Sequence, residues 1–294
     1  MSSLPGKPRG VLRPLTEGNV FQHERRLPCA PLADWVEHFW CVRWDLRHMP
    51  SHLQETLPHP HVHLVVERGA AHIHGVHSAR FQRHLAGRDY AFGIKFKPGG
   101  FYPFLQAPVS GLLNRSLPAQ AVCGIAAQTL AQRMDACTQM DAMVAVAQYF
   151  LLSRLPQHDP YVARVSALVD RIANDLNITS VDQLMAVAAI DKRALQRLFQ
   201  KYLGIGAKWA IKRYRLHEAL AYIQDGNVQS WAALSLDLGY FDQAHFVRDF
   251  HALVGQSPAE YARSMVSTRA HLPWAADLSS PPPKENSVLL HHLR

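Results

Sequence analysis

Two pairs of short helices, separated by one longer helix, are the pattern that most constrains how this chain can fold. The first pair is expected over residues 181–202 and the second over 231–253. Ser180 and Ser230 each precede an apolar-periodic segment, as residues that cap helix N-termini do. The segment between the pairs, 207–224, would form a helix roughly 27 Å long at 1.5 Å per residue. The pattern predicts an all-α domain in which one structural unit occurs twice.

The second helix of each pair has an apolar face and a hydrogen-bonding face. Phe246 and Phe250 in "GYFDQAHFVRDF" are four residues apart and therefore neighbours on a helix, as are Leu195 and Phe199 in the first pair. A helix-turn-helix unit buries one such face and offers the other to the DNA major groove, where Arg can bond guanine and Gln can bond adenine. The sequence predicts two DNA-reading units. An ordinary bundle of six or seven helices with solvated polar faces is the alternative, which the repeat makes less favoured.

Residues 162–264 resemble the DNA-binding domain of AraC/XylS-type transcription regulators. The most specific stretch is "GYFDQAHFVRDFHALVGQSPAEY". Its residues that match the family pattern are Gly239, Tyr240, Asp242, Ala244, Phe246, Arg248, Phe250, Gly255, Ser257, Pro258 and Tyr261. The sequence departs from the pattern at Ala189, where the first turn usually has Gly, at Met185, where a small residue is usual, and at Ser235, where Ala is common. The resemblance implies a sequence-specific transcription regulator rather than an enzyme.

The resemblance also implies which side chains contact double-stranded DNA. The residues expected at base edges are Arg193, Gln196, Arg197, Gln243, His245 and Arg248. The residues expected at phosphates are Lys192, Gln200 and Lys201. The partners expected for such a regulator are RNA polymerase, an unknown small-molecule effector and a second copy of the chain, and no bound cofactor is expected.

The positive charge of the chain is not concentrated in the predicted DNA-binding domain. The whole chain has a formal net charge of +8, which favours an anionic partner. Over residues 159–264, however, Lys and Arg number 12 and Asp and Glu number 11, a difference of only +1. The basic residues there are grouped at 192–201 and at Lys208, Lys212, Arg213 and Arg215, whereas Asp237, Asp242 and Asp249 surround Arg248. Because phosphate contacts supply most of the salt-dependent affinity, the first unit is expected to anchor the complex.

The first half of the chain has the short apolar runs of β-strands. "EHFWCVRWDL", "HVHLVVE", "AHIHGV" and "YAFGIKFK" alternate or run apolar between Gly and Pro residues, which predicts a small antiparallel sheet or barrel. "LPHPHVHLVVE" and "FGIKFKPGGFYPFL" resemble the cupin-like N-terminal domain of many AraC-type regulators, which implies a sensor or assembly role. The predicted fold is therefore α+β. The expected divisions are a flexible N-terminus (1–20), a β-rich domain (21–116), a helical bridge (117–158), a double helix-turn-helix domain (159–265) and a disordered tail (266–294).

Histidines in the β-rich half raise the alternative of a metal-dependent enzyme of the cupin type with a helical appendage. His59, His61 and His63 alternate along one predicted strand. A zinc site, however, needs further ligands at about 2 Å from the metal, whereas alternate side chains on one strand are nearly 7 Å apart. A polar surface or a histidine-lined pocket is the favoured interpretation. The aromatic residues Trp35, Phe39, Trp40 and Trp44 are expected in the core rather than around a ligand.

Composition indicates an ordinary folded protein of the cytoplasm. Hydrophobic residues make up 48% of the 294, which argues against a disordered chain. The four cysteines show no C-x-x-C spacing, so neither a zinc finger nor a disulfide scaffold is expected. No stretch has the length of a signal peptide's apolar segment or of a membrane helix. We expect a cytoplasmic protein without a membrane partner.

Overall fold

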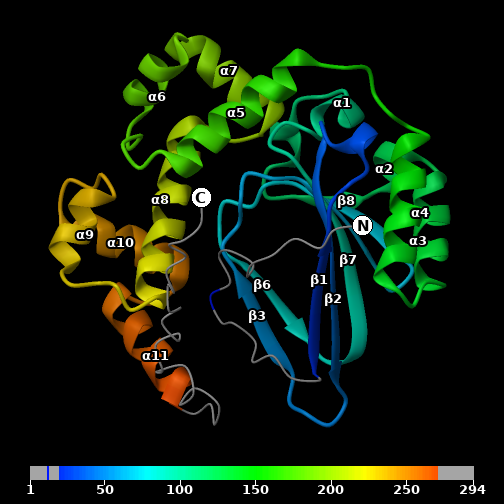
Figure 1. Ribbon diagram of the computed structural model, residues 1–294, viewed down its shortest axis with the longest axis horizontal. Coiled ribbons are helices and arrows are strands. Elements are labelled where there is room, and N and C mark those ends of the chain that lie inside the picture. The colour runs from blue at the N-terminus through cyan, green and yellow to red at the C-terminus, as the bar shows by residue number, and fades with distance from the viewer. Residues whose placement is uncertain (1–11, 13–19, 271–294) are drawn as a thin grey trace, which may run out of the picture.

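The computed structural model describes residue 12 and residues 20–270. The predicted flexible N-terminus and most of the predicted tail lie outside these residues. Within them, an antiparallel β-rich half is followed by an all-helical half (Figure 1). The predicted fold class is thus confirmed.

The main sheet has six strands, and every pair of neighbours is antiparallel. In the order in which they pair, the strands are β1 (Phe21–Arg26), β2 (Val36–Leu46), β7 (Gly87–Phe96), β4 (His63–Glu67), β5 (Ala70–His74) and β8 (Ser116–Pro118). A separate two-stranded antiparallel ribbon consists of β3 (His52–Thr56) and β6 (Phe81–Leu85). The four strands anticipated from the sequence are the four inner strands of the main sheet.

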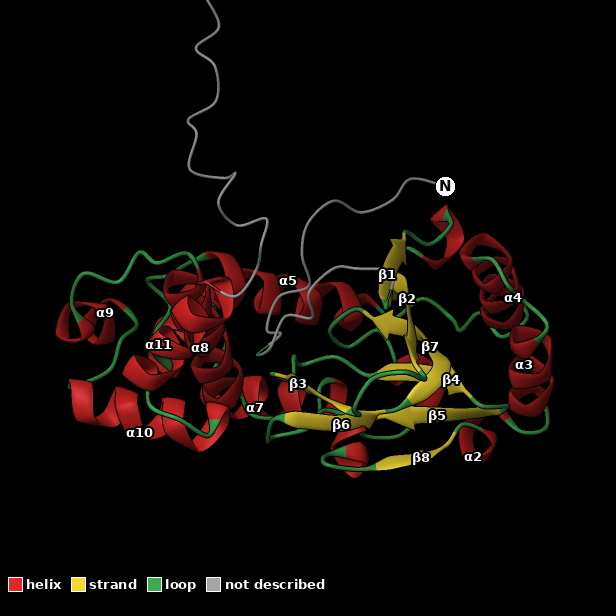
Figure 2. Cartoon of the chain, turned by 90° about the horizontal axis from the view of Figure 1, so that it is seen from below, coloured by secondary structure: helices red, strands yellow, loops and turns green. Residues whose placement is uncertain are grey.

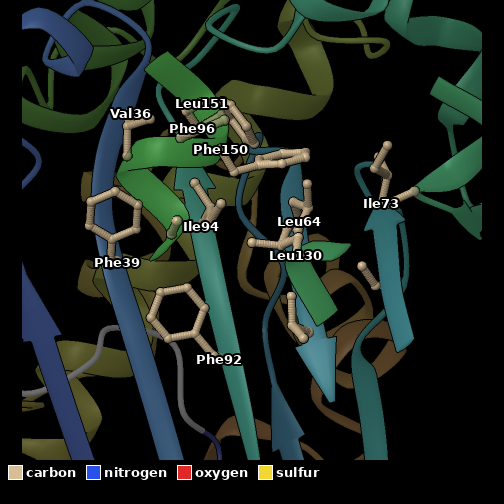
Figure 3. Packing of buried hydrophobic residues seen from close by; sticks show 14 of the residues in the cluster. Val36, Phe39, Leu64, Ile73, Phe92, Ile94, Phe96, Leu130, Phe150 and Leu151 are labelled. Atoms are coloured by element: carbon tan, nitrogen blue, oxygen red, sulfur yellow. The ribbon is translucent and has the colours of Figure 1, made fainter. Parts of the chain in front are cut away.

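One face of the main sheet forms the core of the β-rich half together with two helices, α3 (Ala126–Asp135) and α4 (Met140–Leu152). Successive side chains of a strand point to opposite faces, so Phe92 and Ile94 of β7 enter this core and Ala91 does not. Figure 3 shows Phe39, Phe92 and Ile94 from the sheet gathered with Phe150 from α4. Trp35, Phe39 and Trp44 are buried and Trp40 is half-buried, in agreement with a core role for these aromatic residues.

The helical segment expected to bridge the two halves packs on the sheet instead. Helices α3 and α4 share the core of the β-rich half, and in Figure 1 they lie on the side of the sheet away from the helical half. Four short elements complete this half: η1 (Ala30–Leu32), α1 (Tyr102–Leu105), η2 (Val109–Leu112) and α2 (Gln120–Cys123). The sequence shows the apolar stripes of α3 and α4, but not the surface to which they bind.

The helical half begins at a capped helix start. Asp159 caps α5 (Pro160–Asn174) by accepting a hydrogen bond from the backbone N–H of Tyr161 at 2.9 Å. The remaining helices are α6 (Val181–Ala188), α7 (Lys192–Tyr202), α8 (Ala207–Gln224), α9 (Trp231–Asp237), α10 (Gln243–Val254) and α11 (Pro258–Ala270). In Figure 2, α9, α10 and α11 gather beside α8 at one end of the molecule. Among the described residues, no helix combines the length and apolar character needed to cross a membrane.

Candidate nucleic-acid interface

The first helix-turn-helix unit consists of α6 and α7, and its ends are formed by local hydrogen bonds. At the start of α6 the Ser180 hydroxyl accepts from the Gln183 N–H at 3.2 Å, and the Gln183 side chain accepts from the Ser180 N–H at 2.9 Å. The two bonds form a capping box around Ser180, the residue that the sequence predicted to cap this helix. Ala189 ends α6 in the left-handed region, with φ 47° and ψ 49°. Asp191 then caps α7 through the Ala194 N–H at 2.8 Å.

Helix α7 buries its apolar face and exposes its polar face. Leu195, Leu198, Phe199 and Tyr202 are buried against α5, α6 and α8. The six exposed residues of α7 are Lys192, Arg193, Gln196, Arg197, Gln200 and Lys201. These are the six residues of this helix that the family resemblance assigned to bases and phosphates. The structure thus places all of them on the solvent side of one helix.

The second unit, α9 and α10, repeats this arrangement. Ser230 caps α9 through the Ala233 N–H at 3.3 Å. Gly239 provides the left-handed turn with φ 78°. Asp242 caps α10 by accepting from the His245 N–H at 2.7 Å. The two units therefore use the same residue types to begin their helices.

Helix α10 also presents its predicted DNA-facing residues to solvent. Phe246, Phe250, Leu253 and Val254 are buried, whereas Gln243, His245 and Arg248 are exposed. The His245 ring is held in place because Nδ1 lies 2.9 Å from the Asp242 carboxylate. A carboxylate only accepts hydrogen bonds, so Nδ1 carries the hydrogen and Nε2 remains directed away from this contact. The bonds from His245, the backbone one foremost, lower the pKa of Asp242.

Helix α8 joins the two units and contributes to two separate cores. Its N-terminal part, with Ala210 and Ile211, belongs to the core of the first unit, and its C-terminal part, with Leu220 and Ile223, belongs to the core of the second. Its 18 residues correspond to roughly 27 Å, against about 34 Å for one turn of DNA. The units therefore lie at opposite ends of one continuous helix, with a spacing of the order of one DNA turn.

Two of the basic residues counted on α8 are not available to DNA. Arg213 is 4% exposed and Arg215 is 2% exposed. The Arg213 guanidinium lies 4.7 Å from the Trp209 ring centroid, and burial lowers its pKa to about 10. Arg215 donates to the Ile172 carbonyl of α5. Although the sequence groups them with Lys208 and Lys212, Arg213 and Arg215 therefore do not contribute to an exposed basic surface.

Among the predicted phosphate contacts, Lys201 differs from the others because it lies against the β-rich half. Its Nζ is 4.8 Å from the ring centroid of Tyr102 in α1 and 5.4 Å from that of Tyr202. A cation over an aromatic face is attracted by the ring. Lys192 starts the same helix at the opposite end. In the absence of DNA, the Lys201 ammonium group therefore already contacts aromatic rings at the end of α7 opposite to Lys192.

The β-rich half contacts both units. At the first unit, the rings of Tyr102 and Tyr202 have centroids 4.4 Å apart, and Val76 enters the apolar core. At the second unit, Leu57 enters the core and Arg80 donates to the Val254 carbonyl at the end of α10.

Helix α8 is contacted by the β-rich half as well. Arg213 donates to the Ser78 carbonyl at 2.6 Å, and the rings of His59 and His217 stack with centroids 4.1 Å apart. One segment around the β3–β6 ribbon thus touches both units and the helix between them.

The three histidines considered as metal ligands point to different partners. His59 stacks on His217, the Nε2 of His61 lies 2.8 Å from the Glu37 carboxylate, and His63 Nδ1 accepts from the Trp40 indole at 3.3 Å. Burial lowers the pKa of His61 to about 4. Over the described part of the chain, no group of three or more His, Cys, Asp or Glu residues is arranged to hold a metal ion.

One exposed residue beside the polar face of α10 was not predicted from the sequence. Phe241 is 88% exposed in the turn between α9 and α10, and its ring meets that of His245 edge-on at 6.3 Å. The sequence signal is an aromatic residue between Tyr240 and Asp242, at a position where the family pattern accepts any residue.

Two families match separate parts of the chain. Residues 184–264 match a helix-turn-helix domain, and residues 24–118 match a domain of unknown function. The helix-turn-helix match begins inside α6 and ends inside α11, so it covers nearly all of both units. The β-rich match ends at the last residue of β8.

Several known proteins are similar to this chain. An uncharacterized HTH-type transcriptional regulator of Haemophilus influenzae is 26% identical over 211 residues, which cover 64% of this chain and 69% of the relative. The XylDLEGF operon transcriptional activator 1 of Pseudomonas putida is 28% identical over 106 residues, 35% of this chain and 30% of the relative. Among solved structures, ToxT from Vibrio cholerae aligns with 84% of this chain and 99% of its own at 9% identity, with a TM-score of 0.36.

The position of these matches agrees with the geometry. Both sequence relatives are transcription regulators by name, and the matched domain contains the two capped units with their exposed polar helices. The matched helix-turn-helix domain and the two named relatives support DNA-binding transcription regulation, and the chain is similar to regulators of this type.

Proposed function

We propose that this regulator reads two adjacent major-groove segments of one DNA duplex with α7 and α10. The observation that carries the proposal is the exposure of all six predicted base-contacting side chains, three on each helix, at opposite ends of α8. Those residues are Arg193, Gln196, Arg197, Gln243, His245 and Arg248. Arg and Gln side chains can form paired hydrogen bonds with guanine and adenine edges in the major groove.

The two helices have different tasks in this proposal. Helix α7 carries Lys192, Gln200 and Lys201 beside its base contacts, and these side chains bind phosphates and supply salt-dependent affinity. Helix α10 has Arg248 as its only exposed Lys or Arg. The first unit therefore anchors the protein, and the second mainly distinguishes one sequence from another.

The regulator is tuned through its β-rich half, by a small-molecule effector or by self-association. A cavity of about 260 Å³ lies between Trp35 and Lys97 of the β-rich half and Val162, Ser166 and other residues of the α5 region. Because both halves line this cavity, an effector bound there bears on how the halves contact each other. Filling it with Ala163→Trp is expected to abolish any ligand-induced shift in thermal unfolding while leaving unliganded DNA binding unchanged.

The regulator further acts in the cytoplasm and contacts RNA polymerase once bound to DNA. A relative named as an operon activator supports this step. Transcription of a template that carries the selected site, with and without the protein, measures activation or repression directly.

Selection of DNA from a random pool by the purified full-length protein tests the central proposal. The expected result is a site with two specified segments whose centres lie about 10 bp apart, and a nuclease footprint that covers both. Arg197→Ala should weaken sequence preference in one segment and Arg248→Ala in the other. Recovery of no defined site, or of a site with one segment that both variants affect, would contradict reading by two units.

A further inference from the structure

Two adjacent aromatic residues at the start of α10 have opposite environments. Tyr240 is half-buried in the core of the second unit, with its ring 5.4 Å from that of Phe246. Phe241 is 88% exposed, the largest exposed fraction among the exposed large apolar side chains of the described residues. An exposed phenyl group costs free energy because about 25 cal/mol is lost for each Å² of apolar surface left in water. Packing in this structure therefore does not explain a phenylalanine at this position.

The residues around Phe241 determine the position of its side chain. Gly239 makes the left-handed turn on one side, and Asp242 caps α10 on the other. The Phe241 ring meets the His245 ring edge-on at an interplanar angle of 90°. Phe241 thus sits directly at the N-terminal end of α10, beside a side chain proposed to contact a base.

We propose that Phe241 is a specificity-determining residue that contacts the 5-methyl group of a thymine, next to the base contacted by His245. The inference rests on the proposed reading of DNA by α10. In helix-turn-helix proteins the N-terminal residues of the second helix contact base edges in the major groove. The thymine methyl is the apolar group displayed there, and phenylalanine is among the side chains that contact it.

The position of the ring favours this contact over insertion between bases. Aromatic and other apolar wedges that unstack bases enter from the minor groove and bend the duplex. Phe241 instead directly precedes the cap of α10, whose residues Gln243, His245 and Arg248 are exposed on a helix that fits the wider major groove. A methyl contact buries part of the ring without distorting the DNA.

The test uses the DNA site selected by the full-length protein. Each thymine in the α10 segment is replaced in turn by uracil, which removes only the 5-methyl group. For the wild type, one replacement should weaken binding about fourfold, the equivalent of burying one carbon group of about 0.8 kcal/mol. Phe241→Ala should show a similar loss on the thymine site and no further loss on the uracil site.

Two variants separate the methyl contact from other effects. Phe241→Leu keeps an apolar side chain and should retain part of the discrimination between thymine and uracil. Leu236→Ala removes another exposed apolar side chain of the same unit, one that is 62% exposed on α9, and should bind both sites as the wild type does.

Several outcomes would overturn the inference. They are equal affinity of wild type and Phe241→Ala for the selected site, or uracil losses of the same size in both proteins. If a two-segment site is selected and these results follow, only the role of Phe241 fails. If no site is selected at all, the proposed function fails and this inference fails with it.

Discussion

The two helix-turn-helix units share a framework and differ in the residues they expose. Serine caps the first helix of each unit, aspartate caps the second, and a left-handed residue separates them. Arg197 and Arg248 occupy equivalent positions, two residues before the buried Phe199 and Phe250. Four of the six exposed residues of α7 are Lys or Arg, whereas α10 exposes Arg248 alone of these types.

The buried face of each second helix holds the unit together, and the exposed face carries the residues proposed to contact DNA. The buried face must fit a core, so both units retain apolar residues there. The exposed face does not have to fit a core, so its residues can differ between the two units. Acidic residues make the second unit still less basic than the first. Asp249 of α10 forms an ion pair with Lys212 of α8 at 2.6 Å and so neutralises a positive charge next to the second unit.

The turns differ as well, because the first unit uses Ala189 where the second uses Gly239. Both residues have positive φ, 47° and 78°. Glycine adopts this region without penalty, whereas an L-residue with a side chain does not. Gly239 is also close to the first unit, since a Cβ added to it would lie 2.2 Å from the Thr179 Cβ. The second turn therefore has no room for the residue that the first turn tolerates.

Gly239→Ala should have the largest effect of the changes that probe this comparison. The left-handed strain and the clash with Thr179 together should lower the free energy of unfolding by at least about 2 kcal/mol, measured by chemical denaturation. Gly226→Ala is the matched control, because Gly226 has φ 75° but nothing within 4 Å of an added Cβ. An equal loss in both variants would show that the contact between units contributes nothing.

Arg197→Ala should weaken DNA binding more than Arg248→Ala. Removal of an arginine that bonds a base costs about 1–3 kcal/mol, and the loss should lie toward the upper end for Arg197, whose neighbours on α7 hold the duplex in place. Arg248 is surrounded by acidic residues and should contribute less. Gel-shift titrations on one selected site measure both. Equal losses, or a larger loss for Arg248→Ala, would refute the assignment of anchoring to the first unit.

Ala189→Gly should make the first turn resemble the second and stabilise the protein. Relief of the left-handed strain is worth about 1 kcal/mol in the free energy of unfolding, and DNA affinity should not change. Ala186→Gly, in the exposed middle of α6, should instead lower stability by about 0.5–1 kcal/mol. If both variants destabilise, Ala189 is not strained.

The smallest expected difference is between two lysines of the first unit. Lys192→Ala should reduce the slope of log affinity against log salt concentration by about 1, as loss of one phosphate contact does. Lys201→Ala should reduce it less, because the ammonium group of Lys201 lies over the Tyr102 ring before DNA binds. Filter-binding titrations at several salt concentrations measure the slopes. A larger change for Lys201 would mean that it leaves Tyr102 for the DNA.

The helices of the DNA-binding half were predictable because their signals are local. Capping residues act within three residues of the helix start, and the apolar spacing of α7 follows from helix geometry alone. The strands were predictable only in part. Inner strands β2, β7, β4 and β5 carry apolar runs, whereas edge strands β1 and β8 and the ribbon strands β3 and β6 do not. Strands such as "FQHERR" and "HLQET" form by pairing with a partner distant in sequence.

The polar residues of the candidate site were predictable for the same local reason. Their spacing relative to Leu195, Phe199, Phe246 and Phe250 is enough to place them opposite the buried face of each helix. Phe241 could not be found from helical spacing, because it precedes the helix and hydrophobic residues are usually assigned to the core.

The two capped helix pairs, the long helix between them and their exposed polar faces can all be predicted from the sequence, since helix starts, ends and faces depend on residues within a few positions of one another. The burial of Arg213 and Arg215, the packing of α3 and α4 on the sheet, and the contacts of the segments flanking the β3–β6 ribbon with both units arise from the folded arrangement. These features depend on contacts between segments far apart in the chain, and such contacts cannot be inferred from the spacing of residues along the sequence.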